Sequence, residues 1–89
     1  MKEQIMGVVM HELGVLHQIV KTVARIAAEN RIPLIRHITL EVGTVSGFVP
    51  RYLTRLFPVA VDAHPVLKKA KLRIEMVEGR GLSIKEIGY

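Results

Sequence analysis

The sequence predicts an α/β domain of the α+β type, with two helices packed on one face of a small mixed three-stranded sheet, in the order helix-strand-helix-strand-strand. Three patterns predict it. Apolar residues recur at three- and four-residue steps over residues 11–29, they alternate with polar residues over residues 38–42 and 72–77, and Pro50 opens a second helical stripe. The 89 residues suffice for one small domain with a modest core.

The first helix is expected over residues 11–29, and its apolar stripe is wide enough to pack on more than one side. Asn30 fits the end of this helix, and Pro33 cannot continue it. The stripe consists of Leu13, Leu16, Val20, Val23 and Ala27, and it is widened by Val15, Ile19 and Ile26.

A strand is expected over residues 38–42, because every second side chain there is apolar. Gly43 and Gly47 bracket the loop that follows, and the Ser46 hydroxyl can hydrogen-bond to local backbone in that loop. The apolar face of the strand is formed by Ile38, Leu40 and Val42.

The second helix is expected to begin at Pro50, since proline suits the first helical turn. Pro58 lacks an amide hydrogen and is expected to kink or end the helix, unless it restarts through residues 59–63. The buried face is predicted to contain Leu53, Leu56 and Phe57.

The last two strands are expected to form a hairpin. Residues 72–77 alternate, Gly79-Arg80-Gly81 turns the chain, and Leu82 and Ile84 begin the return strand. A bulge in that strand would bring Ile87 back to the apolar face.

Composition excludes several classes of function. With 49% hydrophobic and 24% charged residues the chain is an ordinary globular protein. It has no apolar run of the roughly 18–20 residues that a membrane span needs and no apolar signal-peptide core, so a cytoplasmic location is expected. Cysteine is absent, which excludes disulfides, a thiol nucleophile and a thiolate metal site.

The net charge of +5 would attract acidic partners, including nucleic acid. The basic residues are spread along the chain, however, and only Lys68-Lys69-Ala70-Lys71 forms a cluster. Two Phe and two Tyr offer little surface on which bases could stack. A solvated basic face is therefore favoured over nucleic-acid binding.

No arrangement typical of an enzyme is found. His11 and His17 are six residues apart, about 240° around a helix, so they cannot share one metal as the histidines of a zinc hydrolase do. Ser46 has no histidine near it in sequence, and no glycine-rich phosphate loop follows a strand. We expect a protein without catalytic activity.

Four segments together resemble the core domain of the HypA/HybF family. Members of that family are nickel metallochaperones that help to insert nickel into [NiFe]-hydrogenases. The four segments are Met-His-Glu-Leu at residues 10–13, Glu-Val-Gly-Thr-Val-Ser-Gly at 41–47, Leu-Arg-Ile-Glu-Met-Val-Glu at 72–78 and Gly-Arg-Gly-Leu-Ser-Ile at 79–84. The resemblance implies a single HypA-like, nickel-binding-type domain over residues 10–89. Residues 1–9 form an N-terminal extension of uncertain status.

The resemblance implies a nickel site at Met10, His11 and Glu12. The family uses the terminal amine, the imidazole and nearby backbone nitrogens, and nitrogen donors in a plane suit Ni(II). In this chain nine residues precede Met10, so a peptide nitrogen replaces the amine and the site is weakened. Two interpretations stay open: the working chain starts at Met10, or His11 is an ordinary polar residue with Glu12 complementing the helix dipole.

Two other departures from the family stand out. The acids of the family's Gly-Glu-Leu-Ser-Gly-Val-Glu-Pro-Glu-like stretch are all replaced over residues 43–51, although the glycines, serine and proline remain. The zinc module with two Cys-x-x-Cys pairs, which the family inserts before the last strand, has no counterpart between Val77 and Leu82. We therefore expect no structural zinc.

The function implied is that of an accessory protein for maturation of a nickel enzyme such as [NiFe]-hydrogenase. It would capture nickel weakly and pass it to an accessory maturation protein or a nickel-enzyme subunit. The alternative is a metal-free interaction module that retains the fold and binds a partner, or a second copy as a homodimer, through the first helix or a sheet edge. A basic nucleic-acid-binding domain is the third hypothesis.

Overall fold

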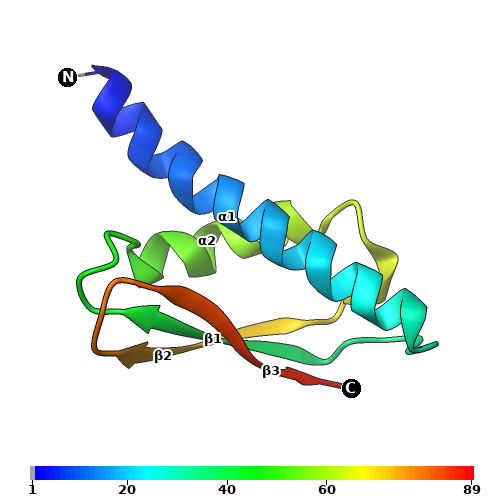
Figure 1. The fold of residues 1–89 in the computed structure, drawn as a ribbon. Coiled ribbons are helices and arrows are strands. Elements are labelled where there is room, and N and C mark those ends of the chain that lie inside the picture. The colour runs from blue at the N-terminus through cyan, green and yellow to red at the C-terminus, as the bar shows by residue number, and fades with distance from the viewer. Residues whose placement is uncertain (1) are drawn as a thin grey trace.

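The structure is a computed structural model that describes the backbone of residues 2–89 and the side chains of residues 11–89. Along these residues the elements are α1 (Lys2–Glu29), β1 (His37–Gly43), α2 (Pro50–Val61), the short 3₁₀ helix η1 (Pro65–Leu67), β2 (Lys71–Val77) and β3 (Leu82–Gly88). Both helices cover the same face of a three-stranded mixed sheet (Figure 1). The predicted fold class and order of elements are confirmed.

Helix α1 is longer than the sequence pattern predicts. It begins at Lys2 instead of His11, and it ends at Glu29 as expected. The Asn30 side chain donates a hydrogen bond to the carbonyl oxygen of Ile26 at 2.8 Å, and Arg31 then turns the chain with a φ of 56°. Residues 10–12 therefore lie inside a helix and not at its first turn.

The predicted hairpin is wrong, because the last two strands do not pair with each other. Strand β1 lies between them, in the order β2-β1-β3, parallel to β2 and antiparallel to β3. Alternation fixes which face a residue belongs to but not which strand is its neighbour. Strands on either side of β1 are only about 10 Å apart, so a short connection reaches across it.

That connection passes closely over the end of β1 (Figure 1). The Gly43 N–H donates to the carbonyl oxygen of Gly81 at 2.8 Å, and the Thr44 N–H donates to that of Val77 at 2.8 Å. A Cβ atom on Gly43 would overlap the backbone carbonyl of Gly79. Only glycine permits this approach.

The predicted bulge in the last strand is confirmed. Thr39 pairs with Glu86 and Leu40 pairs with Ile84, so Lys85 is the extra residue in β3. Both Ile84 and Ile87 consequently pack against the core, although they are three residues apart.

The core lies between the helices and the sheet. Pro58 does not end α2, which runs on to Val61; of the alternatives left open at Pro58, continuation of the helix beyond the proline is the one observed. Pro58 and Thr54 are both exposed, so water can reach the Thr54 carbonyl oxygen that lacks an intrahelical partner. The fully buried apolar side chains come from α1, the 31–36 loop, β1, α2 and η1; they include Leu16, Val20, Val23, Ile35, Ile38, Leu40, Val42, Leu53 and Leu67.

The other face of the sheet is charged and carries no helix. Lys85 Nζ reaches Glu75 Oε1 at 2.8 Å, across the central strand, and His37 Nε2 lies 3.4 Å from Glu86 Oε1. Over the described residues, no helix has both the length and the apolar character that crossing a bilayer requires.

We predict opposite effects from the same substitution at two glycines. Gly43→Ala forces a Cβ against backbone and should lower the free energy of unfolding by about 2 kcal/mol. Gly14→Ala places its Cβ in open space within α1 and should raise it by about 0.5–1 kcal/mol. Urea unfolding measures both, and a stable Gly43→Ala variant would contradict the close crossing of the 78–81 connection.

A second prediction concerns the ion pair across the sheet. The pKa of Lys85 is raised above 10.5, first by its hydrogen bond to Glu75 and then by the attraction of that charge. Because folding raises this pKa, the pair stabilises the fold below about pH 10.5, and the contribution is lost as the pH rises through the folded-state value. In an NMR titration Glu75→Gln should lower the pKa of Lys85, whereas Glu78→Gln should leave it unchanged.

Candidate functional site

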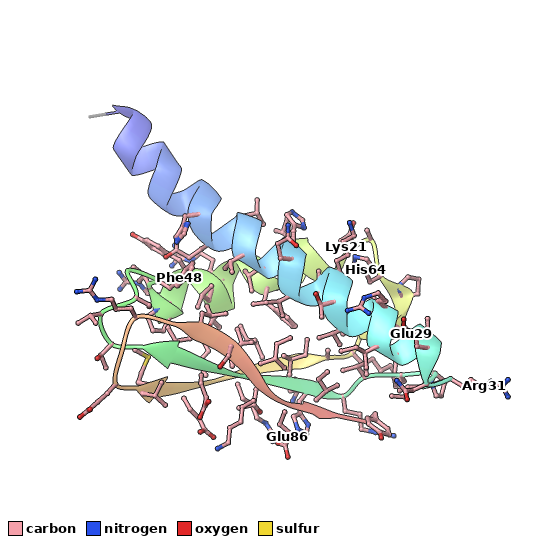
Figure 2. The ribbon with its side chains drawn as sticks, in the orientation of Figure 1. Lys21, Glu29, Arg31, Phe48, His64 and Glu86 are labelled. Carbon is pink, nitrogen blue, oxygen red and sulfur yellow. The ribbon has the colours of Figure 1, made fainter. Side chains whose placement is uncertain are left out.

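The site predicted from sequence lies where α1 meets the segment that leads into α2. His11 and Glu12 are consecutive residues of α1, and they contact Phe48 and Val49, which are consecutive residues just before α2. Figure 2 shows Phe48 at the start of α2, beside α1. Two short stretches that are far apart in the sequence are thereby joined by two adjacent contacts.

Glu12 is fully buried, and its Oε2 accepts a hydrogen bond from the Val49 N–H at 2.7 Å. Val49 is the N-cap residue of α2, and its own side chain makes no capping bond. The first turn of α2 also contains no acidic residue. Since a helix N-terminus carries unsatisfied N–H groups and partial positive charge, the Glu12 carboxylate supplies the cap that α2 lacks.

The second carboxylate oxygen of Glu12 has no such partner. Oε1 is buried and makes no hydrogen bond within the described part of the chain. A buried polar atom without a partner costs free energy, which the contact of Oε2 with Val49 and the positive end of α2 help to offset. Glu12 is thus held by the fold and is not exposed to solvent.

His11 is exposed, but one face of its ring is covered. The imidazole stacks on the Phe48 ring with the centroids 4.3 Å apart and the planes inclined by 6°. The ring nitrogens lie at the edge of the imidazole, in its plane, so a ring stacked on the face does not block them. Of the two predicted site residues whose side chains the structure describes, His11 is the exposed one and Glu12 is buried.

The loop that carries Phe48 is itself well fixed. The Ser46 Oγ accepts a hydrogen bond from the Phe48 N–H at 3.2 Å, as its position in a predicted loop suggested. Gly47 adopts a φ of 87°, a conformation that favours glycine. The sequence analysis did not single out Phe48 and Val49. One signal was available: α2 has neither a capping side chain at its N-cap nor an acid in its first turn, which indicates that a residue from elsewhere in the chain caps it.

The donors for a metal at this place are limited. Across the residues the structure describes, no group of three or more His, Cys, Asp or Glu side chains could hold a metal ion. The Met10 side chain lies outside the described side chains, and the backbone of Met10 belongs to α1. A metal here would combine the His11 imidazole with main-chain nitrogens, which is the donor set that the family resemblance implies.

The other histidines and Ser46 are not brought together. His37 pairs with Glu86 on the open face of the sheet and its ring lies against Gly88, while His17 is exposed on α1. Ser46 has a local role in the loop. None of them forms an acid-base or nucleophilic arrangement with another of these residues.

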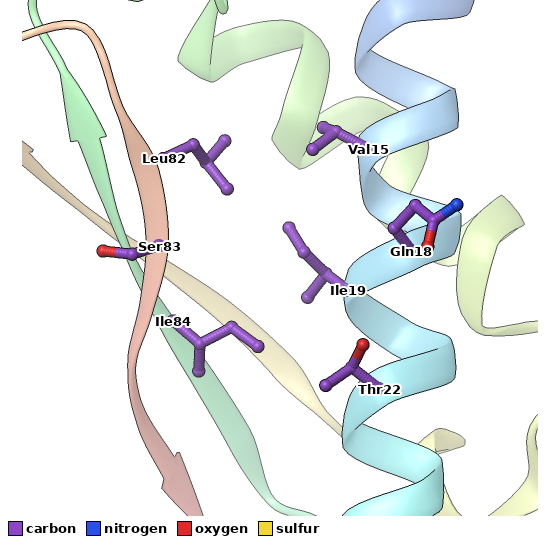
Figure 3. Close-up of a pocket in the computed structure, with 7 residues that line it drawn as sticks. All are labelled: Val15, Gln18, Ile19, Thr22, Leu82, Ser83 and Ile84. Carbon is purple, nitrogen blue, oxygen red and sulfur yellow. The ribbon is translucent and has the colours of Figure 1, made fainter.

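A shallow groove of about 240 Å³ lies between α1 and β3 (Figure 3). Apolar side chains from both elements make most of its walls, and the Ser83 hydroxyl points away from it. No ionisable residue lines it, so it offers no chemistry for catalysis. Its lining consists of Val15, Gln18, Ile19, Thr22, Leu82, Ser83 and Ile84.

Residues 10–84 match the protein-family model described as "Hydrogenase/urease nickel incorporation, metallochaperone, hypA". The chain is 40% identical over 72 residues to the hydrogenase maturation factor HypA of Trichodesmium erythraeum (strain IMS101), which covers 81% of this chain and 60% of that protein. It is 34% identical over 68 residues to the hydrogenase maturation factor HypA of Methanosarcina barkeri (strain Fusaro / DSM 804), and this match covers 76% of this chain and 50% of that protein. No solved structure matches it significantly.

The chain therefore spans about half to three fifths of the length of these curated relatives. The similarities do not favour a metal-free interaction module or a nucleic-acid-binding domain. Because the family match runs from Met10 to Ile84 and both relatives carry the same name, the chain belongs to the HypA family.

Proposed function

We propose that this chain is a nickel carrier for the maturation of a nickel enzyme such as [NiFe]-hydrogenase, and that it acts without catalysis of its own. The observation that carries the proposal is the start of the family match at Met10, which makes Met-His-Glu the first three matched residues. His11, the central residue of the three, has an exposed imidazole.

The state of the Met10 nitrogen decides how well nickel is held. In the full chain Met10 lies inside α1, where each backbone N–H is hydrogen-bonded to a carbonyl oxygen four residues earlier. In a chain that begins at Met10, the amine is free and the first four N–H groups of the helix have no intrahelical partner. We infer that this second form is the one that binds nickel tightly.

Each of the three predicted residues has a distinct role in this proposal. The His11 imidazole is the side-chain ligand, and the Met10 nitrogen is the main-chain ligand. Glu12 supports both, because its bond to Val49 fixes the turn of α1 that carries them. Nitrogen donors of this kind suit Ni(II).

Nickel is the cargo of the protein and not a resident cofactor. A site with one side-chain ligand at the surface can release its metal to a partner, such as an accessory maturation protein or a nickel-enzyme subunit. The names of the two relatives as hydrogenase maturation factors support a partner of this kind.

Nickel titration by calorimetry tests the proposal on the full chain and on a form that begins at Met10. We expect one-site binding that is much tighter in the shorter form, because only that form has the free amine. His11→Ala should abolish this binding in either form. His17→Ala, a change of the other exposed histidine of α1, should leave it unchanged.

Equal binding by the two forms would show that the amine is dispensable and would overturn the assignment of Met10. If neither form shows nickel binding that depends on His11, the proposal that this site carries nickel is wrong. A metal-free interaction module would then be the better description of the chain.

The supporting role of Glu12 predicts a loss of stability. Glu12→Ala leaves the Val49 N–H without its partner and should lower the free energy of unfolding by about 2 kcal/mol. The Val49 amide should also exchange its hydrogen faster. Glu29→Ala, the same change at an exposed position of α1, should cost no more than about 0.5 kcal/mol. Similar losses from both substitutions would contradict the capping role.

A further inference from the structure

The contact between His11 and Phe48 has a geometry that suits a metal ligand. Aromatic pairs are commonly either offset-stacked or edge-to-face, and of these two arrangements only stacking leaves the whole ring edge uncovered by its partner. Here the planes are within 6° of parallel, so the Phe48 ring covers one face of the imidazole and does not lie over its edge. Metal ligands bind through that edge.

We propose that Phe48 is a positioning residue for His11, holding the imidazole in one orientation so that its ring edge is presented to the metal. This inference rests on the proposed nickel function and names a residue that acts through the ligand without touching nickel. An exposed side chain loses rotational freedom when it binds a metal, and that loss costs free energy. Because Phe48 already holds the His11 ring in one orientation, His11 would lose less freedom on binding.

Phe48 can do this because its own backbone is fixed on both sides. The Phe48 N–H is bonded to Ser46 Oγ, and the next N–H, that of Val49, is bonded to Glu12. Phe48 is also half-buried, whereas His11 is exposed. The Phe48 ring is therefore the more enclosed of the two, and in this proposal it orients the His11 ring.

The second phenylalanine of the chain provides a matched control. Phe57 is buried in the core beneath α2 and does not contact His11, so Phe57→Leu makes the same chemical change away from the site. Phe48→Leu removes the aromatic ring and keeps an apolar side chain. Phe48→Tyr keeps the ring.

The first readout needs no metal. Ring-current shifts from Phe48 should move the His11 imidazole protons upfield in the NMR spectrum of the full chain. Phe48→Leu should abolish the shift, while Phe48→Tyr and Phe57→Leu should preserve it. An unshifted His11 in the unsubstituted chain would overturn the stacking and with it the proposal.

The second readout is nickel affinity, measured on the full chain and on the form that begins at Met10. Phe48→Leu should weaken His11-dependent binding about threefold to tenfold, the range expected for one aromatic contact. Phe48→Tyr should restore it, and Phe57→Leu should leave it unchanged even where it lowers the melting temperature.

Undiminished nickel affinity in Phe48→Leu, with the ring-current shift lost, would overturn the positioning role while leaving nickel carriage intact. Absence of His11-dependent nickel binding in the unsubstituted chain would overturn the proposed function and the role of Phe48 in it. The metal-free spectrum would still report whether the two rings stack.

Discussion

The arrangement around the candidate site depends on one hydrogen bond, from the Val49 N–H to Glu12 Oε2 at 2.7 Å. Helix α2 begins with proline and has neither a capping side chain nor an acid in its first turn. The carboxylate that completes its N-terminus comes from α1, 37 residues earlier in the chain. Because Glu12 is fully buried, its carboxylate has few other partners, and the bond to Val49 is the one hydrogen bond that its side chain makes within the described part of the chain. This bond fixes where the loop with Phe48 lies against α1.

The orientation of His11 follows from that constraint. Successive helical residues are about 100° apart, so when Glu12 points into the interface between α1 and α2, His11 comes to lie at its border. There one ring face meets Phe48, while the residue as a whole stays exposed. A side chain deeper in the interface between α1 and α2, such as Glu12, is closed off from a ligand in solution. A side chain farther around α1 would not contact Phe48, which orients His11 in the proposed site.

Local patterns in the sequence predicted the two helices, the three strands, the buried face of β1 and a bulge in the last strand, because each depends on residues close together in the chain; the structure places that bulge at Lys85. They did not predict that β1 separates β2 from β3, since the only local trace of that crossing is a glycine at position 43. They identified His11 and Glu12 through a family resemblance, but not Phe48 or Val49. Those contacts join segments 37 residues apart in the sequence. The spacing of apolar residues within one helix or strand carries no information about contacts over that separation.

The two kinds of donor in the Met-His-Glu segment are thus used for different purposes. The oxygen donor, Glu12, is fully buried, with Oε2 bonded to the Val49 N–H and Oε1 enclosed in the same interface, so the carboxylate is not presented at the surface. The loop over residues 43–51 carries no acid that could replace it. The donor that remains at the surface is the His11 imidazole, and in the proposed function the Met10 nitrogen joins it once the chain begins at Met10. If the proposed nickel site is correct, a donor set of this kind would disfavour hard, oxygen-seeking cations such as Mg²⁺ and Ca²⁺ and would keep the nitrogen donors that Ni(II) prefers. In that proposal, burial of the carboxylate that caps α2 would contribute to selectivity, because it leaves no oxygen ligand beside His11 at the surface.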